Sequence, residues 1–256
     1  MGNVLALVSG GGSPGVTTAA IALALTWSAE AIVAECDPGG GDILAGLLAG
    51  YVPAARGLME HAIEAGRDSH SAAICLSTQL VSLDAARRRT LLPGLTDPRQ
   101  AVGLAPAWPA VAASLTAQRA DVIADCGRLD AGDGQPTAVI EAAQTVALVL
   151  RPTLRQVWSA RSRIEILTHL LEGTDRLVLL LTGSGTHAAR DVAQALQLPV
   201  AAVLPHDARG AALLSDGLGA RRHLRSAPLM RSARVAGAAL RQHATARSQS
   251  RALLRK

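Results

Sequence analysis

Short apolar runs alternate with longer segments of helical periodicity along most of the chain. Each run has the length of a strand, and each longer segment has the length of a helix. The predicted strands cover residues 3–8, 31–35, 121–125, 145–150, 176–181 and 200–204, with one more inside 72–83. The predicted helices cover residues 17–29, 58–65, 109–118, 154–171, 186–196 and 209–216. This alternation predicts an α/β, doubly wound fold, with a mainly parallel sheet flanked by helices.

The last segment of the chain differs from the rest. We expect residues 1–227 to form one α/β domain, because no repeat and no long linker divides them. Residues 228–256 interleave apolar residues with Arg231, Arg234, Arg241, Arg247, Arg251, Arg255 and Lys256. This pattern predicts a basic amphipathic helix with a frayed end. Such a helix is compatible with packing on the domain, with a protein partner, or with peripheral membrane or non-specific DNA contact.

Composition narrows the classes of function. Aromatic residues make up 2% of the chain and Phe is absent, which argues against a single-stranded nucleic-acid binder that stacks bases. The net charge of +5 comes almost wholly from arginine, because Lys256 is the single lysine. Three scattered cysteines and the lack of a signal-like start predict a reduced, cytoplasmic protein, at most peripheral at the inner face of the membrane. The seven histidines form no ligand pair, so we expect surface or loop positions.

A glycine-rich segment, SGGGSPGVTT at residues 9–18, joins the first predicted strand to the first predicted helix. Residues 10–17 match the phosphate-loop spacing G-x-x-x-x-G-K-[ST], except that Val16 replaces the lysine. Such a loop binds phosphate through backbone N–H groups and the helix N-terminus. The alternative is a tight strand-to-helix turn. The candidate phosphate-binding residues are Gly10, Gly11, Gly12, Ser13, Pro14, Gly15, Val16, Thr17 and Thr18.

Two acidic residues follow predicted strands. Asp37 comes just after the second strand, and Asp125 ends the strand at 121–125. The carboxyl ends of parallel strands meet at one edge of a sheet, so both acids should lie near the loop. Mg²⁺ prefers oxygen ligands and commonly accompanies a bound triphosphate. The candidate metal ligands are Thr17, Asp37 and Asp125.

Four motifs in order give the chain a resemblance to a known family. GGSPGVTT at residues 11–18 lines up with the deviant loop K-G-G-x-G-K-[ST]-T, with Gly11 and Val16 at its two lysines. The other motifs are Asp37-Pro38 for switch I, with Glu35 at its first acid, Asp125-Cys126-Gly127 for switch II, and Leu204-Pro205-His206-Asp207 for the adenine segment. Over roughly residues 3–217 the chain resembles the MinD/ParA-type P-loop ATPases, with the pilus-positioning branch (CpaE/TadZ-like) as the most natural home.

The resemblance implies ATP and Mg²⁺ as cofactors and a homodimer in which the signature lysine reaches the partner's phosphates. It also implies that Asp37 orients the attacking water, that Thr17 holds Mg²⁺, and that Pro205 and Asp207 contact adenine. The family function is spatial organisation of a pilus or secretion apparatus, a flagellum, a division site or a chromosome. The protein partner is not specified by any motif.

The chain departs from the family pattern because both loop lysines are missing. Hydrolysis should suffer more than binding, since a cation stabilises charge that grows in the transition state. Arginine is the only substitute: Arg151 is a candidate nucleotide contact, whereas Arg128 has the ordinary explanation of a surface ion pair. We therefore expect conditional ATP binding with slow or absent hydrolysis. The alternative is a nucleotide-free scaffold that works through protein contacts.

Overall fold

The computed structural model describes residues 1–48, 56–67, 69–130, 132, 134–217, 224 and 226–254. Within these residues, the side chains of 69–71, 73 and 247–254 are outside the described part. The strands are β1 Val4–Ser9, β2 Ala31–Glu35, β3 Val81–Ser82, β4 Arg89–Leu92, β5 Asp121–Arg128, β6 Thr145–Leu150, β7 Leu177–Thr182 and β8 Val200–Leu204. The α-helices are α1 Val16–Thr26, α2 Leu58–Arg67, α3 Ser69–Gln79, α4 Ala101–Leu104, α5 Trp108–Thr116, α6 Thr137–Ala142, α7 Leu154–Leu170, α8 Ala189–Leu196, α9 Ala208–Ser215 and α11 Pro228–Leu254, and short 3-10 turns lie at Pro98–Gln100 and Ala105–Ala107.

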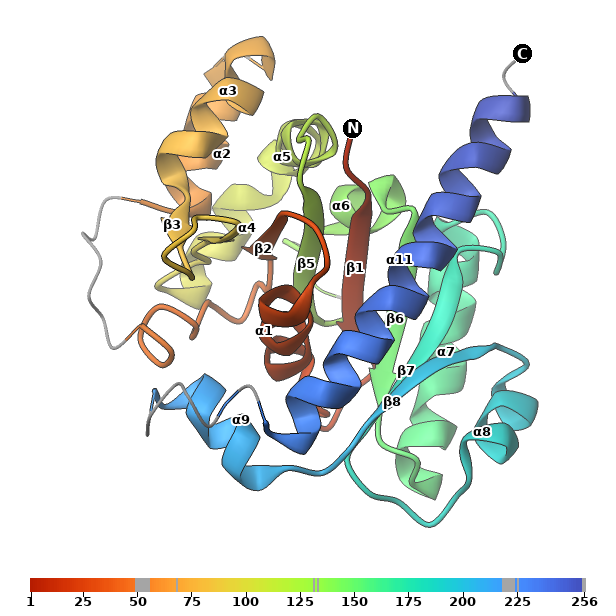
Figure 1. Ribbon diagram of the computed structural model, residues 1–256. Coiled ribbons are helices and arrows are strands. Elements are labelled where there is room, and N and C mark those ends of the chain that lie inside the picture. The colour runs from red at the N-terminus through yellow and green to blue at the C-terminus, as the bar shows by residue number, and fades with distance from the viewer. Residues whose placement is uncertain are drawn as a thin grey trace.

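The strands form one sheet in the order β3-β4-β2-β5-β1-β6-β7-β8 (Figure 1). All neighbouring pairs are parallel except β3 with β4. β1 lies between β5 and β6, and the chain crosses over through helices on the two faces of the sheet. The predicted doubly wound α/β fold is confirmed.

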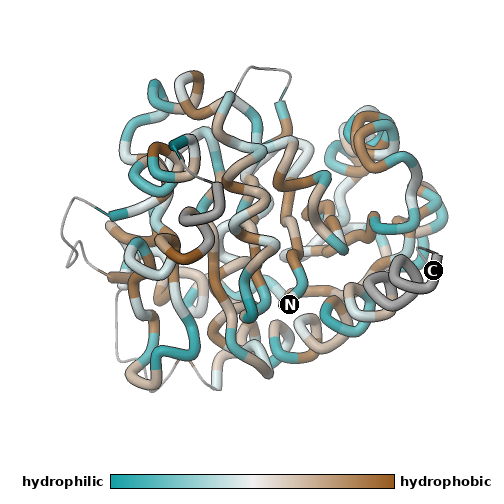
Figure 2. Tube along the Cα trace, turned by 90° about the horizontal axis from the view of Figure 1, so that it is seen from above, coloured by the Kyte–Doolittle hydropathy of each residue, from teal (hydrophilic) through white to brown (hydrophobic). Residues whose placement is uncertain are grey.

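Two hydrophobic clusters lie on the two faces of the sheet. One cluster packs α2, α5, α6, α7 and α8 on the sheet, and the other packs α1, α9 and α11 on the opposite face. The central strands β1, β6 and β7 are buried along their whole length, as expected for parallel strands covered on both sides. Figure 2 shows the helices on both sides of the sheet, with α11 along one of them.

Helix α11 lies against α1 and β8 over its first turns (Figure 1). Its buried residues recur at helical spacing: Leu229, Met230, Ala233, Ala236, Leu240 and Ala244. Gly237 lets the helix approach closely, because a Cβ there would lie 3.1 Å from the ring of Trp27. The basic side chains of Arg247, Arg251, Arg255 and Lys256 lie outside the described residues. None of the helices in the described part of the chain combines the length and the apolar character that crossing a bilayer requires.

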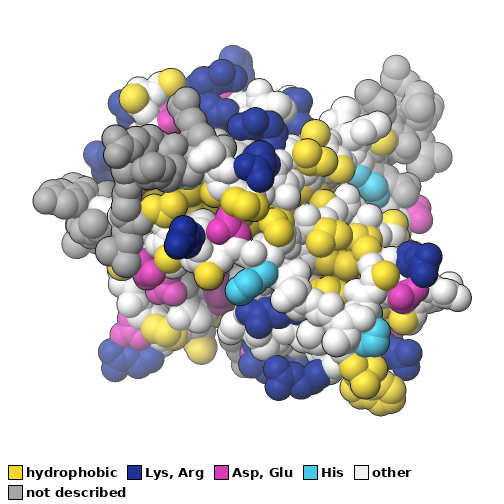
Figure 3. Space-filling view, turned by 60° about the horizontal axis from the view of Figure 1, so that its bottom comes forward, with side chains coloured by type: hydrophobic (Ala, Val, Ile, Leu, Met, Phe, Trp, Pro, Cys, Tyr) yellow, Lys and Arg dark blue, Asp and Glu magenta, His cyan; other side chains and the backbone are white. Residues whose placement is uncertain are grey.

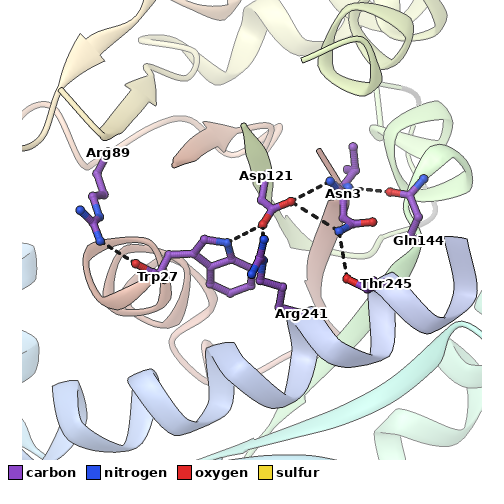
Figure 4. A network of polar contacts seen from close by, with 8 residues as sticks. Asn3, Trp27, Arg89, Asp121, Gln144, Arg241 and Thr245 are labelled. Carbon is purple, nitrogen blue, oxygen red and sulfur yellow. Dashed lines mark hydrogen bonds and ion pairs between the residues drawn. The ribbon is translucent and has the colours of Figure 1, made fainter. Parts of the chain in front are cut away.

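A polar network ties the second half of α11 and the amino-terminal edge of the sheet together (Figure 4). Asp121 Oδ2 accepts hydrogen bonds from Trp27 Nε1 and from Arg241 Nε, each at 2.8 Å. The backbone N–H of Asn3 donates to Asp121 Oδ1 at 2.8 Å. Desolvation alone would raise the pKa of the buried Asp121, but these donors outweigh it and lower the pKa. Asp121 is therefore a fully partnered structural carboxylate.

Several sequence-based element assignments needed correction. The strand predicted inside 72–83 is present as β3 at Val81–Ser82, but most of that segment is helix α3, which was not predicted. A short apolar run can form either a strand or a helix. Here most of the segment is helical, because it packs against α2 and α5. Strand β4 and helix α6 were not predicted. Strand β4 begins at Arg89, the last residue of the arginine run 87–89, and this run masks the strand pattern of the buried pair Leu91 and Leu92.

The expected surface position of the histidines was wrong for His61. This side chain is fully buried between α2 and α5, with Nε2 at 2.6 Å from Ser114 Oγ. Desolvation lowers the pKa of His61, so the neutral ring is favoured in the folded state. His61 is a core residue whose Nε2 is hydrogen-bonded, whereas its buried Nδ1 has no partner in the described part of the chain.

Candidate nucleotide site

The glycine-rich loop between β1 and α1 takes left-handed backbone conformations. The φ angles are 144° at Gly11, 71° at Gly12, 43° at Ser13 and 95° at Gly15. Glycine adopts such angles without the steric cost of a Cβ, which explains its frequency here. Apart from Gly11 and its two chain neighbours, no atom of the described residues lies within 4 Å of the position that a Cβ on Gly11 would take, so open space adjoins the loop at that residue. The loop is not collapsed onto itself.

The loop is anchored at its middle and leads directly into α1. Thr182 Oγ1 donates to the carbonyl of Pro14 at 2.8 Å, which ties the buried Pro14 to β7. Helix α1 begins at Val16 with no side-chain cap, so its first N–H groups have no capping side chain. Unbonded amides at a helix start favour an anion.

The side chain of Val16 packs in the core, so only the backbone N–H of this residue is a candidate phosphate contact. Its side chain is 6% exposed and belongs to the hydrophobic cluster on the α1 face of the sheet. The substitution therefore removes the cation and also turns this position into a core contact. Thr17 and Thr18, which follow it, are partly exposed.

The acids expected near the loop do meet there. Asp125 is buried at 1% exposure and accepts a hydrogen bond from the Thr17 hydroxyl. Desolvation, with the nearby charges of Asp37 and Glu35, raises the pKa of Asp125 to about 7. Hydrogen bonds from Thr17 and from the Gly127 N–H, at 3.1 Å, oppose this rise. A buried carboxylate with acidic neighbours and no cation in contact is a place where a bound cation lowers the free energy.

Asp37 lies beside the end of β5. Its Oδ1 accepts the Gly39 N–H at 2.7 Å, and burial raises the pKa of its carboxyl group. A Cβ on Gly127 would come within 2.0 Å of Asp37 Cγ, and Gly127 has φ 62°. Glycine at this position therefore allows the two acids to approach the same point.

Glu35 has a structural role. This buried side chain accepts N–H groups from Ile43 at 2.9 Å and Gly94 at 3.0 Å. Desolvation by burial raises the pKa of Glu35 despite these bonds. The residue joins the loops that follow β2 and β4, and so it supports the segment that carries Asp37.

A pocket of about 290 Å³ adjoins the loop on the side of β7 and β8. Its lining includes Arg151 and the loop residues Ser13, Pro14, Gly15 and Thr18, together with Pro205, His206 and Asp207. The structure thus brings the predicted adenine segment and Arg151 to one pocket with the loop. Asp207 caps α9 and α11, because its carboxylate accepts N–H groups from Gly210 at 2.9 Å and Leu229 at 3.1 Å.

Arg128 has the ordinary position that the sequence favoured. It is 59% exposed in its side chain and forms an ion pair with Asp130 at 3.0 Å. Figure 3, with the bottom of Figure 1 turned forward, shows acidic, basic and hydrophobic side chains intermixed on this edge of the molecule. The surface is not uniformly positive.

Sequence reasoning missed two residues of α7 that contact the loop. Gln156 Oε1 accepts the N–H of Arg151 at 2.7 Å, and Gln156 Nε2 lies 3.0 Å from the Cβ position of Gly12. Arg163 Cγ lies 3.4 Å from the Cβ position of Gly10. Both residues share a helix stripe with the buried Ala160 and Leu167, at spacings of three and four. The sequence signal for both residues was a polar side chain on the face of a predicted helix that packs against the core.

The loop and the acids beside it meet some of the requirements for binding a polyphosphate and Mg²⁺. The backbone cradle and the Thr17–Asp125 pair offer amides and oxygen ligands of the kind these groups take. The expected ammonium groups are absent, and the acids leave the site short of positive charge. Among the described residues, no group of three or more His, Cys, Asp or Glu side chains is arranged to hold a metal ion.

Comparisons with known proteins define the fold. No family model matches the chain, and no curated protein gives a significant match. A ParA family ATPase from Chlorobium tepidum TLS is similar with TM-score 0.73 and 16% identity, covering 93% of this chain and 99% of that chain. The cell division ATPase MinD from Pyrococcus furiosus gives TM-score 0.73 and 18% identity, covering 94% of this chain and 99% of that chain.

The septum site-determining protein MinD from Pyrococcus horikoshii OT3, complexed with Mg-ADP, gives TM-score 0.70 and 17% identity over 93% of this chain and 95% of that chain. Identities this low establish the fold alone. The chain therefore has the MinD/ParA-type P-loop ATPase fold, as the four motifs predicted.

Proposed function

We propose that this protein is a MinD/ParA-like spatial organiser or regulatory switch that binds ATP with Mg²⁺ and hydrolyses it slowly or not at all. The observation that supports this proposal most strongly is the open left-handed loop at Gly11, Gly12, Ser13 and Gly15, set before the uncapped start of α1. A turn that only joined a strand to a helix would need neither successive left-handed residues nor free space at Gly11.

In this proposal each element of the site has a separate task. The amides of residues 10–18 hold the phosphates, and Thr17 and Asp125 hold Mg²⁺ with Asp37 beside them. The pocket of Arg151, Pro205 and Asp207 receives the base. Bound Mg²⁺ supplies positive charge to the phosphates and to Asp125. It therefore takes over part of the charge that the missing lysines would carry.

Slow hydrolysis follows from the lost lysines. Asp37 is the one residue assigned to orienting a water, and no lysine lies in the described chain to stabilise the growing charge. An arginine or lysine at the transferred phosphate commonly contributes orders of magnitude to the rate. Binding survives more readily, because the backbone cradle contributes in the ground state as well.

The organiser role comes from the fold, since the similar structures carry the printed roles of cell division and septum-site determination. The proposal includes a homodimer, a protein partner in a larger assembly, and the pilus-positioning branch as the closest setting. The exposed Arg231 and Arg234 of α11 leave peripheral membrane or DNA contact as a further task of the C-terminal segment. Binding to nucleic acid should then weaken steeply between low and moderate salt.

The test is calorimetry and thermal denaturation with ATP and Mg²⁺. Saturating ligand should raise the free energy of unfolding by about 3 kcal/mol at a concentration of ~100 Kd. Thr17→Val should remove the Mg²⁺ dependence, because the substitution keeps the shape and loses the hydroxyl. Arg151→Ala should weaken ATP binding, and an unchanged titration would remove Arg151 from the site.

A nucleotide-free scaffold is the second candidate, favoured by the core position of Val16 and by the uncompensated acids. It predicts no thermal shift at millimolar ATP with or without Mg²⁺. It also predicts that Thr17→Val leaves partner binding intact. Retained partner binding without any nucleotide effect would decide for the scaffold.

A further inference from the structure

The site lacks positive charge most clearly at the end of the glycine-rich loop that lies away from the base pocket. That pocket is lined by Ser13, Pro14, Gly15 and Thr18 but not by residues 10–12. A nucleotide with its base in the pocket would extend its outer phosphates toward Gly11 and Gly12. The charged side chains of the strand-end segments here include the acids Asp37, Asp125 and Asp130.

Arg163 reaches this end of the loop from the opposite face of the sheet. Its Cγ lies 3.4 Å, and its Cβ 3.8 Å, from the Cβ position of Gly10. The side chain is 27% exposed, so it packs beside the loop rather than extending into solvent. Helix α7 holds it there, because Ala160 one turn earlier also contacts Gly10, at 3.8 Å from the same position.

The guanidinium group of Arg163 is poorly satisfied. Its Nε is buried and has no hydrogen-bond partner within the described part of the chain. One amino group lies 3.9 Å from Asp130 Oδ1, the limit for an ion pair, and the other donates to Ser162 Oγ at 3.0 Å. A buried donor without an acceptor is unfavourable, and a charged donor more so. An anion that offered acceptors at this position would relieve that cost.

The neighbouring arginines, Arg128 and Arg151, make contacts at other positions. Arg128 holds Asp130 at 3.0 Å, so this carboxylate keeps a partner when Arg163 moves away. Arg151 lines the pocket at the base end of the loop. Arg163 is therefore the arginine that lies against the first glycine of the loop and still has an unused donor.

We propose that Arg163 supplies the positive charge that the loop has lost, contacting the outer phosphates of the bound nucleotide, and that Asp130 holds Arg163 when no polyphosphate is bound. This inference rests on the proposed nucleotide binding. Asp130 and the phosphates then compete for one guanidinium group. Removal of Arg163 should weaken binding, and removal of the charge of Asp130 should strengthen it.

The experiment is calorimetric titration of the full chain with ATP–Mg²⁺ and with inorganic tripolyphosphate–Mg²⁺. Arg163→Gln should weaken both affinities by about tenfold or more, since a charge-assisted contact is lost. Arg163→Lys should recover part of the loss. Asp130→Asn should tighten binding by about two- to fivefold, as expected for an exposed competing pair. The matched control is Arg161→Gln on the same helix, whose side chain stacks on Trp158 at 5.2 Å and should leave both affinities unchanged.

The outcomes separate the inference from the function on which it rests. Wild-type protein that binds neither ligand would overturn both the nucleotide proposal and the role of Arg163. If the wild type binds both ligands, and Arg163→Gln and Asp130→Asn bind them equally well, only the role of Arg163 is overturned. A loss in Arg163→Gln with no recovery by Arg163→Lys and no gain in Asp130→Asn would mark a packing defect and reject the competition. Melting curves of the variants identify any that fail to fold, and Asp130→Asn then carries the test.

Discussion

Strand β5 carries two buried aspartates, Asp121 at its first residue and Asp125 in its second half, and they differ in the charges that surround them. Asp121 accepts N–H groups from Asn3, Trp27 and Arg241, and these donors lower its pKa (Figure 4). Asp125 has acidic neighbours and no cation in contact within the described part of the chain, and its pKa rises to about 7. Burial alone therefore does not define a functional carboxylate. Asp125 is a candidate metal ligand because it combines burial with a position beside the glycine-rich loop, and such a group gains from a bound metal ion. Glu35 is also buried with a raised pKa, but it joins two loops through backbone N–H groups.

The comparison extends to the two edges of the sheet. The amino-terminal edge is closed by α11, whose Arg241 completes a polar network on Asp121. At the carboxyl-terminal edge, the first amides of α1 lack a capping side chain, Arg163 Nε is unsatisfied and open space adjoins Gly11. The loop edge thus combines an uncapped helix start, an unsatisfied arginine and open space. Buried polar atoms without a partner in the described chain also occur elsewhere, at His61, Glu64, Arg89 and Gln135.

The largest expected effect is on the pH dependence of the free energy of unfolding, which tests the difference between Asp121 and Asp125. An unfolded Asp titrates near 4, and native Asp125 titrates at about 7, so in this window the native state holds the extra proton. The free energy of unfolding should then fall as pH rises, by about 1.4 kcal/mol per pH unit for one proton. Urea denaturation of wild type and Asp125→Asn at pH 4 to 8, without divalent cations, measures it.

The difference between the two proteins isolates Asp125, because the contributions of His61, Asp37 and Glu35 are largely common to both. Mg²⁺ at pH 8 should stabilise wild type and leave Asp125→Asn unaffected. Parallel stability curves for the two proteins would show that Asp125 carries no burial penalty.

The second test is Asp121→Asn, which we expect to lower the free energy of unfolding by about 3 kcal/mol at pH 7. The substitution leaves Arg241 without its carboxylate and weakens the bonds to Asn3 and Trp27. Chemical denaturation measures the loss. The control is Asp84→Asn, because the carboxylate of Asp84 is more exposed than that of Asp121 (27% against 6%) and its pair with Arg89 is longer, at 3.4 Å. This pair should be worth less than about 1 kcal/mol. Equal losses at Asp84 and Asp121 would contradict the structural role of the network.

Restoring a cation to the loop should have a smaller but opposite effect. Val16→Lys should raise the affinity for ATP–Mg²⁺ by about tenfold or more, since a charge-assisted contact is worth ~1.5–3 kcal/mol. It should also lower the melting temperature without ligand, because Val16 packs in the core. Calorimetry and thermal denaturation check the two signs. Val16→Met is the control of similar length, and the same gain from Met would rule out charge as the cause.

The smallest effect on stability is expected at the buried His61, between α2 and α5. Ser114→Ala should cost about 1 kcal/mol of stability, because it removes the hydrogen-bond partner of His61 Nε2. The lowered pKa of His61 means that its contribution is complete above about pH 6.5 and is lost as the pH falls through the folded value. ATP affinity should not change. A change in affinity would show that this helix pair communicates with the loop.

Most of the fold could be predicted from local sequence. Residues 31–35, 145–150 and 200–204 match β2, β6 and β8 at both ends, since parallel strands form short continuous apolar runs. The segments that failed lie at the periphery. An apolar run became α3 because it packs on two other helices, and an arginine run concealed β4.

The site could be predicted in part. Spacing and glycine content identified the loop, and strand ends identified Asp37 and Asp125. The roles of Gln156 and Arg163 could not be read from any motif, because their contacts with the loop come from a helix that crosses on the other face of the sheet.

The amino-acid sequence by itself determined the sheet, the order of its elements, the lysine-free loop and the approach of its acids to one edge. These features depend on hydrophobic periodicity and backbone chemistry, which act over short distances along the chain. The tertiary structure alone decided which carboxylate gained a cation and which arginine lies beside the loop. Those facts depend on contacts between residues up to about 150 positions apart in sequence, and electrostatic free energy depends on the distance in space.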